Sequence, residues 1–291
     1  MKRILITGKD SYIGTSVERR LKQRGGYTVD TVDMQDPDWR GKSFAGYDAV
    51  LNVAGIAHTD TGKISEEQRR LYYAVNTELT AETAAKAKAD GVKQFIFMSS
   101  IIVYGDSAPI GKQKMITPDT QPAPANVYGD SKLQAEKRLL ALSDDTFKVV
   151  ILRPPMIYGR NSKGNYPQLS RFAQKLPFFP CVQNQRSMLY IGNFTAFVQL
   201  IIDNGEAGIF FPQNADYTNT SQMVKTIGAV HGKKVRLVKG VTPLLRLLSH
   251  VTGLVNKAFG NLCYEQRMSE YKTDYRLFSL EESIRETESA E

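Results

Sequence analysis

Short apolar segments alternate with helix-like segments in the first half of the chain, and this alternation constrains the fold more than any other feature. Apolar segments span residues 3–7, 27–32, 48–54, 94–98 and 148–152, and helical patterns span 11–23, 71–90 and 127–142. Strands that are apolar along their whole length must be covered on both faces, which is typical of parallel sheets. With right-handed crossovers, the pattern predicts a doubly wound α/β fold.

The pattern changes after Arg153. Several prolines interrupt the following segment, which has little regular periodicity, and further on residues 208–211 predict a short strand and 194–203 and 280–288 predict helices. We therefore expect one domain over residues 1–155. A smaller, mixed α/β region follows over 156–291, with some segments that return to the core of the first domain.

Composition narrows the classes of protein that need to be considered. The 291 residues carry a formal charge of +8, which suggests an anionic partner, but no aromatic-plus-basic pattern supports a nucleic acid. Cys181 and Cys263 make no disulfide framework and fit no zinc pattern, so we expect no metal site and a reducing, cytoplasmic environment. The start of the sequence has too short an apolar run for a signal peptide, and no apolar run is long enough to span a membrane.

A glycine-containing turn, TGKDSYIG at 7–14, follows the first strand and opens the first helix. Gly8 permits a tight turn, Gly14 permits close packing of helix and strand, and the helix amides face the turn, as in a dinucleotide site. Ser11 stands where the usual fingerprint has a middle glycine, and its Cβ lies near the phosphate path. A plain strand–turn–helix junction is the alternative interpretation.

Asp33 ends the second strand, 19 residues after Gly14. An acidic side chain there accepts hydrogen bonds from the adenosine ribose hydroxyls and repels a 2′-phosphate. The sequence therefore favours NAD over NADP, although an exposed Asp at a strand end would look the same.

Tyr128 and Lys132 lie four residues apart, on one face of the helix expected at 127–142. An ammonium group beside a phenol stabilises the phenolate, so such a Tyr can exchange a proton with a sugar hydroxyl while hydride moves to nicotinamide. Ser99 and Ser100 end the fourth strand at the sheet edge where ligands bind, and a hydroxyl there can hydrogen-bond the reacting oxygen.

With these motifs in this order, the sequence resembles the extended short-chain dehydrogenases/reductases, in particular the NAD-dependent nucleotide-sugar epimerase/dehydratase family. The resemblance covers most of the chain up to about residue 215. The matching segments are TGKDSYIG, DAVLNVAG at 48–55, YYAVN at 72–76, SSIIVYG at 99–105, YGDSK at 128–132, LRPPMIYG at 152–159, KGNY at 163–166 and RSMLYIGNF at 186–194. The implied fold is a Rossmann domain followed by a substrate-binding region.

The resemblance also implies roles for individual residues. The catalytic residues would be Ser100, Tyr128 and Lys132, with Ser100 also touching substrate. Pro154 and Met156 would lie near the nicotinamide, and Asn165 and Arg186 would hold the nucleotide diphosphate. Together with Tyr128 and Lys132, the other residues around the cofactor would be Gly8, Tyr12, Ile13, Gly14, Asp33, Ala54, Gly55, Asn76 and Ser99. A homodimer would form through the helices at 71–90 and 127–142.

The predicted activity is hydride transfer at C4 of a nucleotide-activated hexose, as in a UDP-sugar 4-epimerase of surface-polysaccharide synthesis. Pro155-Met156 stands where many 4-epimerases have an aromatic residue and an Asn, which favours the alternative of a UDP-4-keto-6-deoxy-hexosamine 4-reductase. A non-catalytic NAD-binding regulator is a third hypothesis, against which the intact Ser–Tyr–Lys set argues. His58 follows the third strand and could touch the sugar, although a loop His is more often merely solvated.

Residues 242–262 carry apolar side chains at helical spacing within a strongly basic region. Residues 221–276 hold 10 Lys+Arg and 3 Asp+Glu, a local charge of +7. The segment could lie on an anionic membrane surface. We favour a helix that faces the core with a solvated basic face, because Gly253 and Gly260 weaken a membrane helix and the periodicity fits both.

Overall fold

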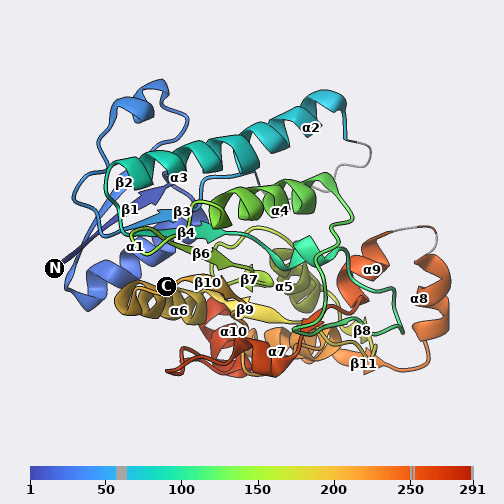
Figure 1. Ribbon diagram of the computed structural model, residues 1–291. Helices are drawn as coiled ribbons and strands as arrows, with labels where there is room; N and C mark the ends of the chain where they lie inside the picture. Colours follow the sequence, from blue (N-terminus) through green and yellow to red (C-terminus); the bar gives the residue numbers. More distant parts are fainter. Residues whose placement is uncertain (57–63, 250, 252, 290–291) are drawn as a thin grey trace. The chain divides into compact units, whose positions relative to one another are not determined.

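The computed structural model describes residues 1–56, 64–249, 251 and 253–289 (Figure 1). The chain divides into two compact units. The first unit holds 1–105, 121–154 and 195–211, and the second holds 106–120, 155–194 and 212–291. The change of pattern expected near residue 155 falls at a unit boundary, and 195–211 returns to the first unit. His58 lies outside the described residues.

A six-stranded sheet forms the centre of the first unit, in the order β10-β6-β4-β3-β1-β2. All of its neighbouring strands are parallel, which confirms the predicted doubly wound α/β fold. The strands are β1 (Lys2–Thr7), β2 (Tyr27–Val32), β3 (Ala49–Asn52), β4 (Gln94–Met98), β6 (Lys148–Leu152) and β10 (Gly208–Phe210). Because the chain moves from β1 to one side for β2 and then to the other for β3, a crevice opens at the carboxyl ends of β1 and β3.

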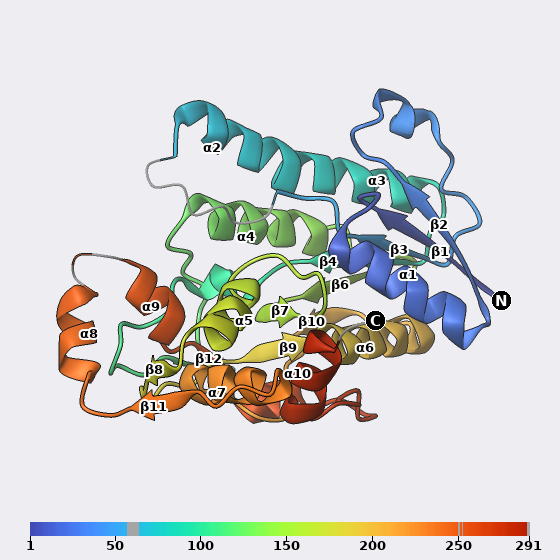
Figure 2. The ribbon, with the colours of Figure 1, turned by 180° about the vertical axis from the view of Figure 1, so that it is seen from behind.

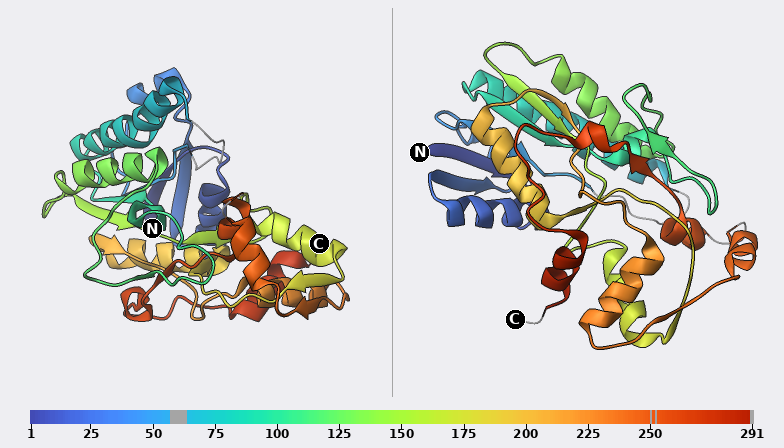
Figure 3. Two further views of the ribbon diagram at one scale, coloured as in Figure 1. Left: turned by 90° about the vertical axis from the view of Figure 1, so that its right-hand side faces the viewer. Right: turned by 90° about the horizontal axis from the view of Figure 1, so that it is seen from below.

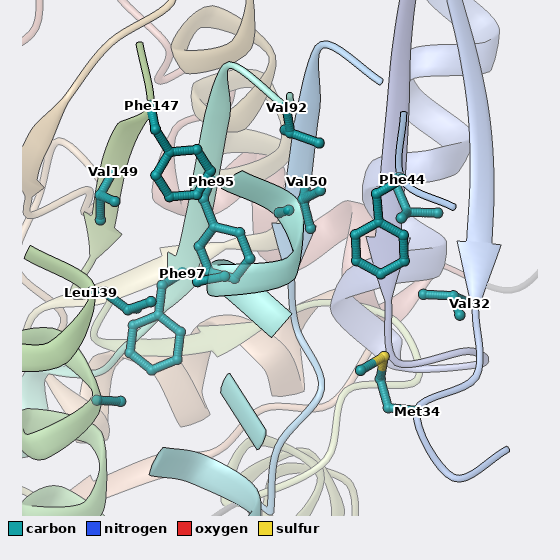
Figure 4. Close-up of a cluster of buried hydrophobic side chains, with 14 of the residues drawn as sticks. Val32, Met34, Phe44, Val50, Val92, Phe95, Phe97, Leu139, Phe147 and Val149 are labelled. Atoms are coloured by element: carbon teal, nitrogen blue, oxygen red, sulfur yellow. The ribbon is translucent and has the colours of Figure 1, made fainter. Parts of the chain in front are cut away.

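Helices cover both faces of this sheet. On one face, Phe95, Phe97 and Val149 of the strands pack with Leu139 and other apolar side chains around them (Figure 4). That face is covered by α3 (Thr80–Ala89) and α4 (Val127–Leu140). On the other face lie α1 (Tyr12–Arg24) and the part of α6 (Ile191–Asn204) that belongs to this unit, which are side by side in Figure 3 and joined by an Arg20–Gln199 hydrogen bond. Burial on both faces explains why the strands are apolar throughout.

The helix expected at 71–90 begins earlier and is not uniform. Ser65 caps α2 (Glu66–Tyr73) through a reciprocal capping box with Gln68, so the helix starts five residues before the predicted position. A π-helical turn, η2 (Ala74–Leu79), then joins α2 to α3, and the whole run lies along α4 (Figure 2). Two short 3₁₀ turns complete the unit, η1 (Pro37–Gly41) and η3 (Ile101–Tyr104).

The second unit is built from short elements around its own apolar core. Its two-stranded sheets pair β5 (Met115–Ile116) with β12 (Cys263–Tyr264), β7 (Met156–Tyr158) with β9 (Met188–Tyr190), and β8 (Phe178–Pro180) with β11 (Arg236–Val238). Its helices are α5 (Tyr166–Lys175), α7 (Thr220–Val230), α8 (Thr242–Leu248), α9 (Gly253–Phe259), the 3₁₀ turn η4 (Gln266–Ser269) and α10 (Leu280–Glu288). Stacked Tyr158 and Tyr166 rings lie inside the core.

The structure corrects the expectation for residues 242–262. Two helices, α8 and α9, replace the single expected helix. Val255 and Phe259 of α9 are buried in the core, as expected, but α8 buries none of its residues. The favoured core-facing interpretation is therefore wrong for Leu244, Leu247 and Leu248, whereas Leu245 of α8 is partly buried against the core. No helix within the described residues is long and apolar enough to cross a membrane.

A buried ion pair ties three elements of the first unit together at the carboxyl edge of the sheet. Glu136 of α4 and Arg153, which directly follows β6, are 1% and 5% exposed and form a two-pronged ion pair with N–O distances of 3.0 and 2.5 Å. Ser99, after β4, donates to the same carboxylate, and Arg153 also donates to the Tyr104 hydroxyl at 2.6 Å. The pair thus fixes α4 to the ends of β4 and β6.

Removing one partner of this pair should destabilise the first unit strongly. Arg153→Met leaves the Glu136 carboxylate buried without its cation, so we expect the free energy of unfolding to fall by about 3–5 kcal/mol in urea titrations. Lys88→Met breaks an exposed pair with Asp144 and should cost less than about 1 kcal/mol. Equal, small losses for both variants would contradict the structural role assigned to the buried pair.

Candidate active site

The turns that follow β1 and β3 touch backbone to backbone in the crevice. Gly8 has φ +85°, and a Cβ placed on it would lie 2.9 Å from the amide nitrogen of Ala54. The Thr7 hydroxyl donates to the Asn52 side-chain oxygen at 2.7 Å and fixes the two strand ends to each other. Only glycine fits at position 8, and the turn leaves backbone rather than side chains at the bottom of the crevice.

The first turn of α1 faces this cradle, and Ser11 is its N-cap. The Ser11 hydroxyl accepts from the Gly14 amide at 3.1 Å, and a Cβ on Gly14 would lie 2.6 Å from that hydroxyl oxygen. Ser11 therefore takes the capping role, which explains how the turn dispenses with a middle glycine. Tyr12 and Ile13 begin the helix, where amide groups and the helix dipole favour an anion. A dinucleotide diphosphate fits this donor set.

Asp33 lies directly after β2, beside the end of β1. Its side chain is half-buried, and one carboxylate oxygen accepts from the Gln35 amide at 2.9 Å. This hydrogen bond holds the carboxylate at the edge of the sheet, the position from which an acidic group can reach a ribose.

Asn76 connects the β3 turn to α4 from within the π-helical turn. Its side chain is fully buried; the oxygen accepts from the Ile56 amide at 2.9 Å, and the nitrogen donates to the Ile56 carbonyl and to the Ser131 hydroxyl. A Cβ on Gly55 would lie 2.9 Å from the Asn76 oxygen and 3.1 Å from Lys132 Nζ. The cofactor-type cradle and the Tyr–Lys helix therefore meet at Gly55, Asn76 and Lys132.

Tyr128 and Ser100 form a hydrogen bond, with Ser100 at the start of η3 after β4. Asn126 caps α4 two residues before Tyr128, by accepting from the Gly129 amide at 2.9 Å, so the Tyr lies in the first turn. The edge of the Tyr72 ring packs against Tyr128, with centroids 6.3 Å apart. Burial raises the pKa of Tyr128 to about 12, and the hydrogen bond with Ser100 opposes this rise.

Lys132 is 5% exposed and points toward the end of β4. Its Nζ donates to the Met98 carbonyl at 2.9 Å and lies 4.7 Å from the centre of the Phe97 ring. Burial lowers the pKa of Lys132 to about 8, and the Glu136 carboxylate one helical turn later opposes this shift. Lys132 is thus a buried amine whose pKa, at about 8, lies only slightly above neutral pH.

Pro154 is buried at the end of the first unit, and the remaining predicted site residues lie in the second unit. Met156 begins β7 and is half-buried, and Asn165 precedes α5 at its N-cap without making a side-chain capping bond. The Arg186 guanidinium donates to the Lys257 carbonyl, and burial lowers its pKa. Their expected roles near cofactor and substrate stay predictions.

Sequence reasoning missed three side chains that support helix α4 around Tyr128 and Lys132. Tyr72 packs on Tyr128, Tyr73 donates from its hydroxyl to Asp130, and Glu136 carries the ion pair behind Lys132. The spacing of Tyr128, Lys132 and Glu136 at four-residue intervals signals a shared helix face and could have identified Glu136. Within the described residues, no group of three or more His, Cys, Asp or Glu side chains could hold a metal ion.

Known proteins match the chain over most of its length. The model of the NAD dependent epimerase/dehydratase family matches residues 4–211. A UDP-glucose 4-epimerase of Vibrio cholerae is 33% identical over 252 residues, which cover 78% of this chain and 75% of that protein. A second relative is an Escherichia coli O157:H7 protein, N-acetyl-alpha-D-glucosaminyl-diphospho-ditrans,octacis-undecaprenol 4-epimerase. It is 27% identical over 278 residues, which cover 88% of this chain and 81% of that protein.

Solved structures show the same fold. The UDP-glucuronic acid 4-epimerase of Bacillus cereus in complex with NAD aligns over 98% of this chain and 95% of its own, with a TM-score of 0.74 and 16% identity. The sheet order, the two turns in the crevice and the family match agree with one another. The chain belongs to the NAD-dependent epimerase/dehydratase family, a family of nucleotide-sugar epimerases and reductases among the extended short-chain dehydrogenases/reductases.

Proposed function

We propose that this enzyme transfers hydride at C4 of a UDP-activated hexose with NAD and acts as a 4-epimerase. The observation that carries the proposal is the meeting of the cofactor-type cradle with the Tyr–Lys helix at Gly55, where Asn76 and Lys132 approach the β3 turn. The 4-epimerase activities named for the Vibrio and Escherichia relatives support the choice of C4 chemistry.

Tyr128 is the proton-transfer residue in this proposal. Its phenolate oxygen takes the proton of the sugar C4 hydroxyl as C4 is oxidised, and the resulting phenol returns that proton as C4 is reduced, while Ser100 hydrogen-bonds the reacting oxygen. The nicotinamide, when bound, supplies the hydride acceptor and donor. In an epimerase the 4-keto sugar rotates in the site between the two hydride transfers and presents its other face. The proton and the hydride both return to the same substrate.

Lys132 makes Tyr128 usable as a base. Burial raises the pKa of Tyr128 to about 12, so the phenol holds its proton too tightly at neutral pH, and catalysis requires a nearby positive charge that stabilises the phenolate. A pKa of about 8 leaves Lys132 mostly protonated at neutral pH, so it can supply that charge. Its hydrogen bond to the Met98 carbonyl fixes the ammonium group at the strand end.

Asp33 supports NAD as the cofactor. A carboxylate held at the end of β2 can accept hydrogen bonds from the ribose hydroxyls, and it repels the additional phosphate of NADP. On the substrate side, we retain Asn165 and Arg186 as the proposed diphosphate ligands and the 71–90 and 127–142 helices as the proposed dimer surface.

A 4-keto-sugar reductase is the second candidate. Pro155 is buried and Met156 is half-buried, so the amide that many 4-epimerases carry beside the sugar is replaced here by apolar side chains. In this reaction, Tyr128 donates one proton as hydride arrives at C4, and the reduced cofactor is consumed in each turnover.

Cofactor stoichiometry should distinguish the two candidates. As an epimerase, the purified enzyme should convert UDP-hexose without added cofactor and should release NAD on denaturation, because the hydride returns in each cycle. Chromatography of denatured protein and of product measures both. Steady consumption of NADH with a UDP-4-keto sugar, without epimerisation, would show the reductase instead.

Tyr128→Phe removes the proton-transfer hydroxyl and keeps the ring. We expect kcat to fall by about 10²- to 10⁴-fold, with NAD binding measured by calorimetry within a few-fold of wild type. Tyr73→Phe, which removes a hydroxyl bonded to Asp130 on the same helix pair, is the matched control and should retain most activity. Full activity of Tyr128→Phe would exclude the proposed mechanism and favour a non-catalytic NAD-binding protein.

The buried position of Lys132 predicts a pH dependence of stability. Between pH about 8 and 10.5 the unfolded chain keeps the Lys132 proton and the folded, cofactor-free chain loses it, so the free energy of unfolding rises with pH in this window. Across this pH window, the free energy of unfolding of wild type should rise by up to roughly 3 kcal/mol relative to that of Lys132→Met, as measured in urea titrations. Lys137→Met, at an exposed position of the same helix, is the control. A constant difference between wild type and Lys132→Met would refute the lowered pKa.

A further inference from the structure

The helix α8 carries its apolar stripe toward solvent. Leu244, Leu247 and Leu248 follow the i, i+3, i+4 spacing of one helix face and are 59%, 67% and 42% exposed. Val251, three residues after the helix ends, is 85% exposed. An apolar stripe with this spacing normally faces the core of a protein. Here it is an exposed surface within the second unit.

Other side chains of α8 attach the helix to its unit and fix this orientation. Leu245 packs against the core cluster, and the Arg246 guanidinium lies over Gly111, where a Cβ would come within 2.5 Å of its Nη2. The helix is therefore held by one side while the Leu stripe stays on the other.

Other elements of the same unit also expose apolar side chains. In the β8–β11 pair, Phe178 lies opposite Arg236, and Val238 lies two residues further along β11. Phe178 and Val238 are 53% and 40% exposed, whereas Phe179, the next residue of β8, is buried in the core. Phe172 and Leu176, one turn apart at the end of α5, are also exposed. Figures 1 and 2 show β8, β11 and α8 at the same end of this unit. We call the exposed apolar residues of α5, β8, β11 and α8 the apolar patch.

The chain segment that carries β11 and α8 is basic. Residues 217–264 contain no Asp or Glu, and their Lys and Arg residues are Lys225, Lys233, Lys234, Arg236, Lys239, Arg246 and Lys257. Lys233, Lys234, Arg236 and Lys239 are exposed on β11 or within three residues of it in the sequence. A shallow pocket of about 450 Å³ is lined by Arg171, Lys175 and Lys233. This surface thus combines apolar side chains with positive charge.

We propose that the apolar patch docks on an anionic membrane surface. Exposed Leu, Val and Phe side chains would enter the boundary between head groups and acyl chains, while the flanking lysines and arginines would contact anionic head groups. A second copy of the chain fits less well, because pairing two such patches would bring like charges together. The proposal does not depend on the proposed C4 chemistry, which takes place in the first unit.

Vesicle sedimentation of the full chain tests the proposal. We expect binding to vesicles of phosphatidylcholine with added phosphatidylglycerol, much weaker binding to phosphatidylcholine alone, and loss of binding at high salt. Neutralising Lys233, Lys234 and Arg236 to Gln should weaken binding by about tenfold or more. L244S/L247S should weaken it by about tenfold, because the variant removes apolar side chains that are exposed in the free protein.

Matched variants separate docking from general effects. L277S removes an exposed leucine that lies outside the apolar patch, and Lys22, Lys42 and Lys93 to Gln removes three exposed charges of the first unit. Both should bind vesicles like wild type, and all variants should keep wild-type activity on a soluble nucleotide sugar. Absence of vesicle binding by wild type, or equal binding by L244S/L247S, would overturn the proposal. A wild-type oligomer that L244S/L247S dissociates, without vesicle binding, would show that the patch joins protein chains instead.

Discussion

The carboxyl edge of the sheet depends on one buried carboxylate, that of Glu136. It is 1% exposed, so it needs the two-pronged pairing with Arg153 and the hydrogen bond from Ser99 to remain charged. Because Tyr128 and Lys132 lie two turns and one turn earlier on the same helix face, fixing Glu136 also fixes their height above the strand ends. The proposed chemistry therefore rests on a charge that takes no part in it, and the helix cannot slide without unpairing two buried ions.

Much of the first unit could be predicted because strong signals agreed. Uninterrupted apolar strands indicated a sheet covered on both faces, and polar residues directly after those strands fell at one edge of the sheet. Ser11 shows how a local departure can be resolved by structure, because the residue that weakened the dinucleotide fingerprint is the cap of α1. The early start of α2 was missed because residues 66–70 are polar throughout, although Ser65 and Gln68 have the spacing of a capping box.

Other features were outside the reach of sequence patterns for physical reasons. Helical periodicity shows that Leu244, Leu247 and Leu248 share a face, but it does not say whether that face meets core or solvent. The pairing of Glu136 with Arg153 joins residues on separate elements, and a charged residue after a strand usually indicates an exposed end. Likewise, the diphosphate role predicted for Arg186 rests mainly on the family resemblance, and its contact with the Lys257 carbonyl depends on how the second unit folds.

The π-helical turn at Ala74–Leu79 has a consequence for how this chain can vary in length. Such a turn accommodates one additional residue, which rotates everything beyond it by about 100° relative to a regular α-helix. Side chains are buried on both sides of the turn: Tyr72 before it, and Thr80 and Ala84 after it. The packing therefore depends on the rotational position of the helix both before and after the turn. Loss of a single residue there would remove this rotation. Either the side chains around Tyr72 or those of α3 would then point away from the surface against which they pack. This stretch of helix is therefore fixed in length to the residue, with Asn76 at the point where the phase changes.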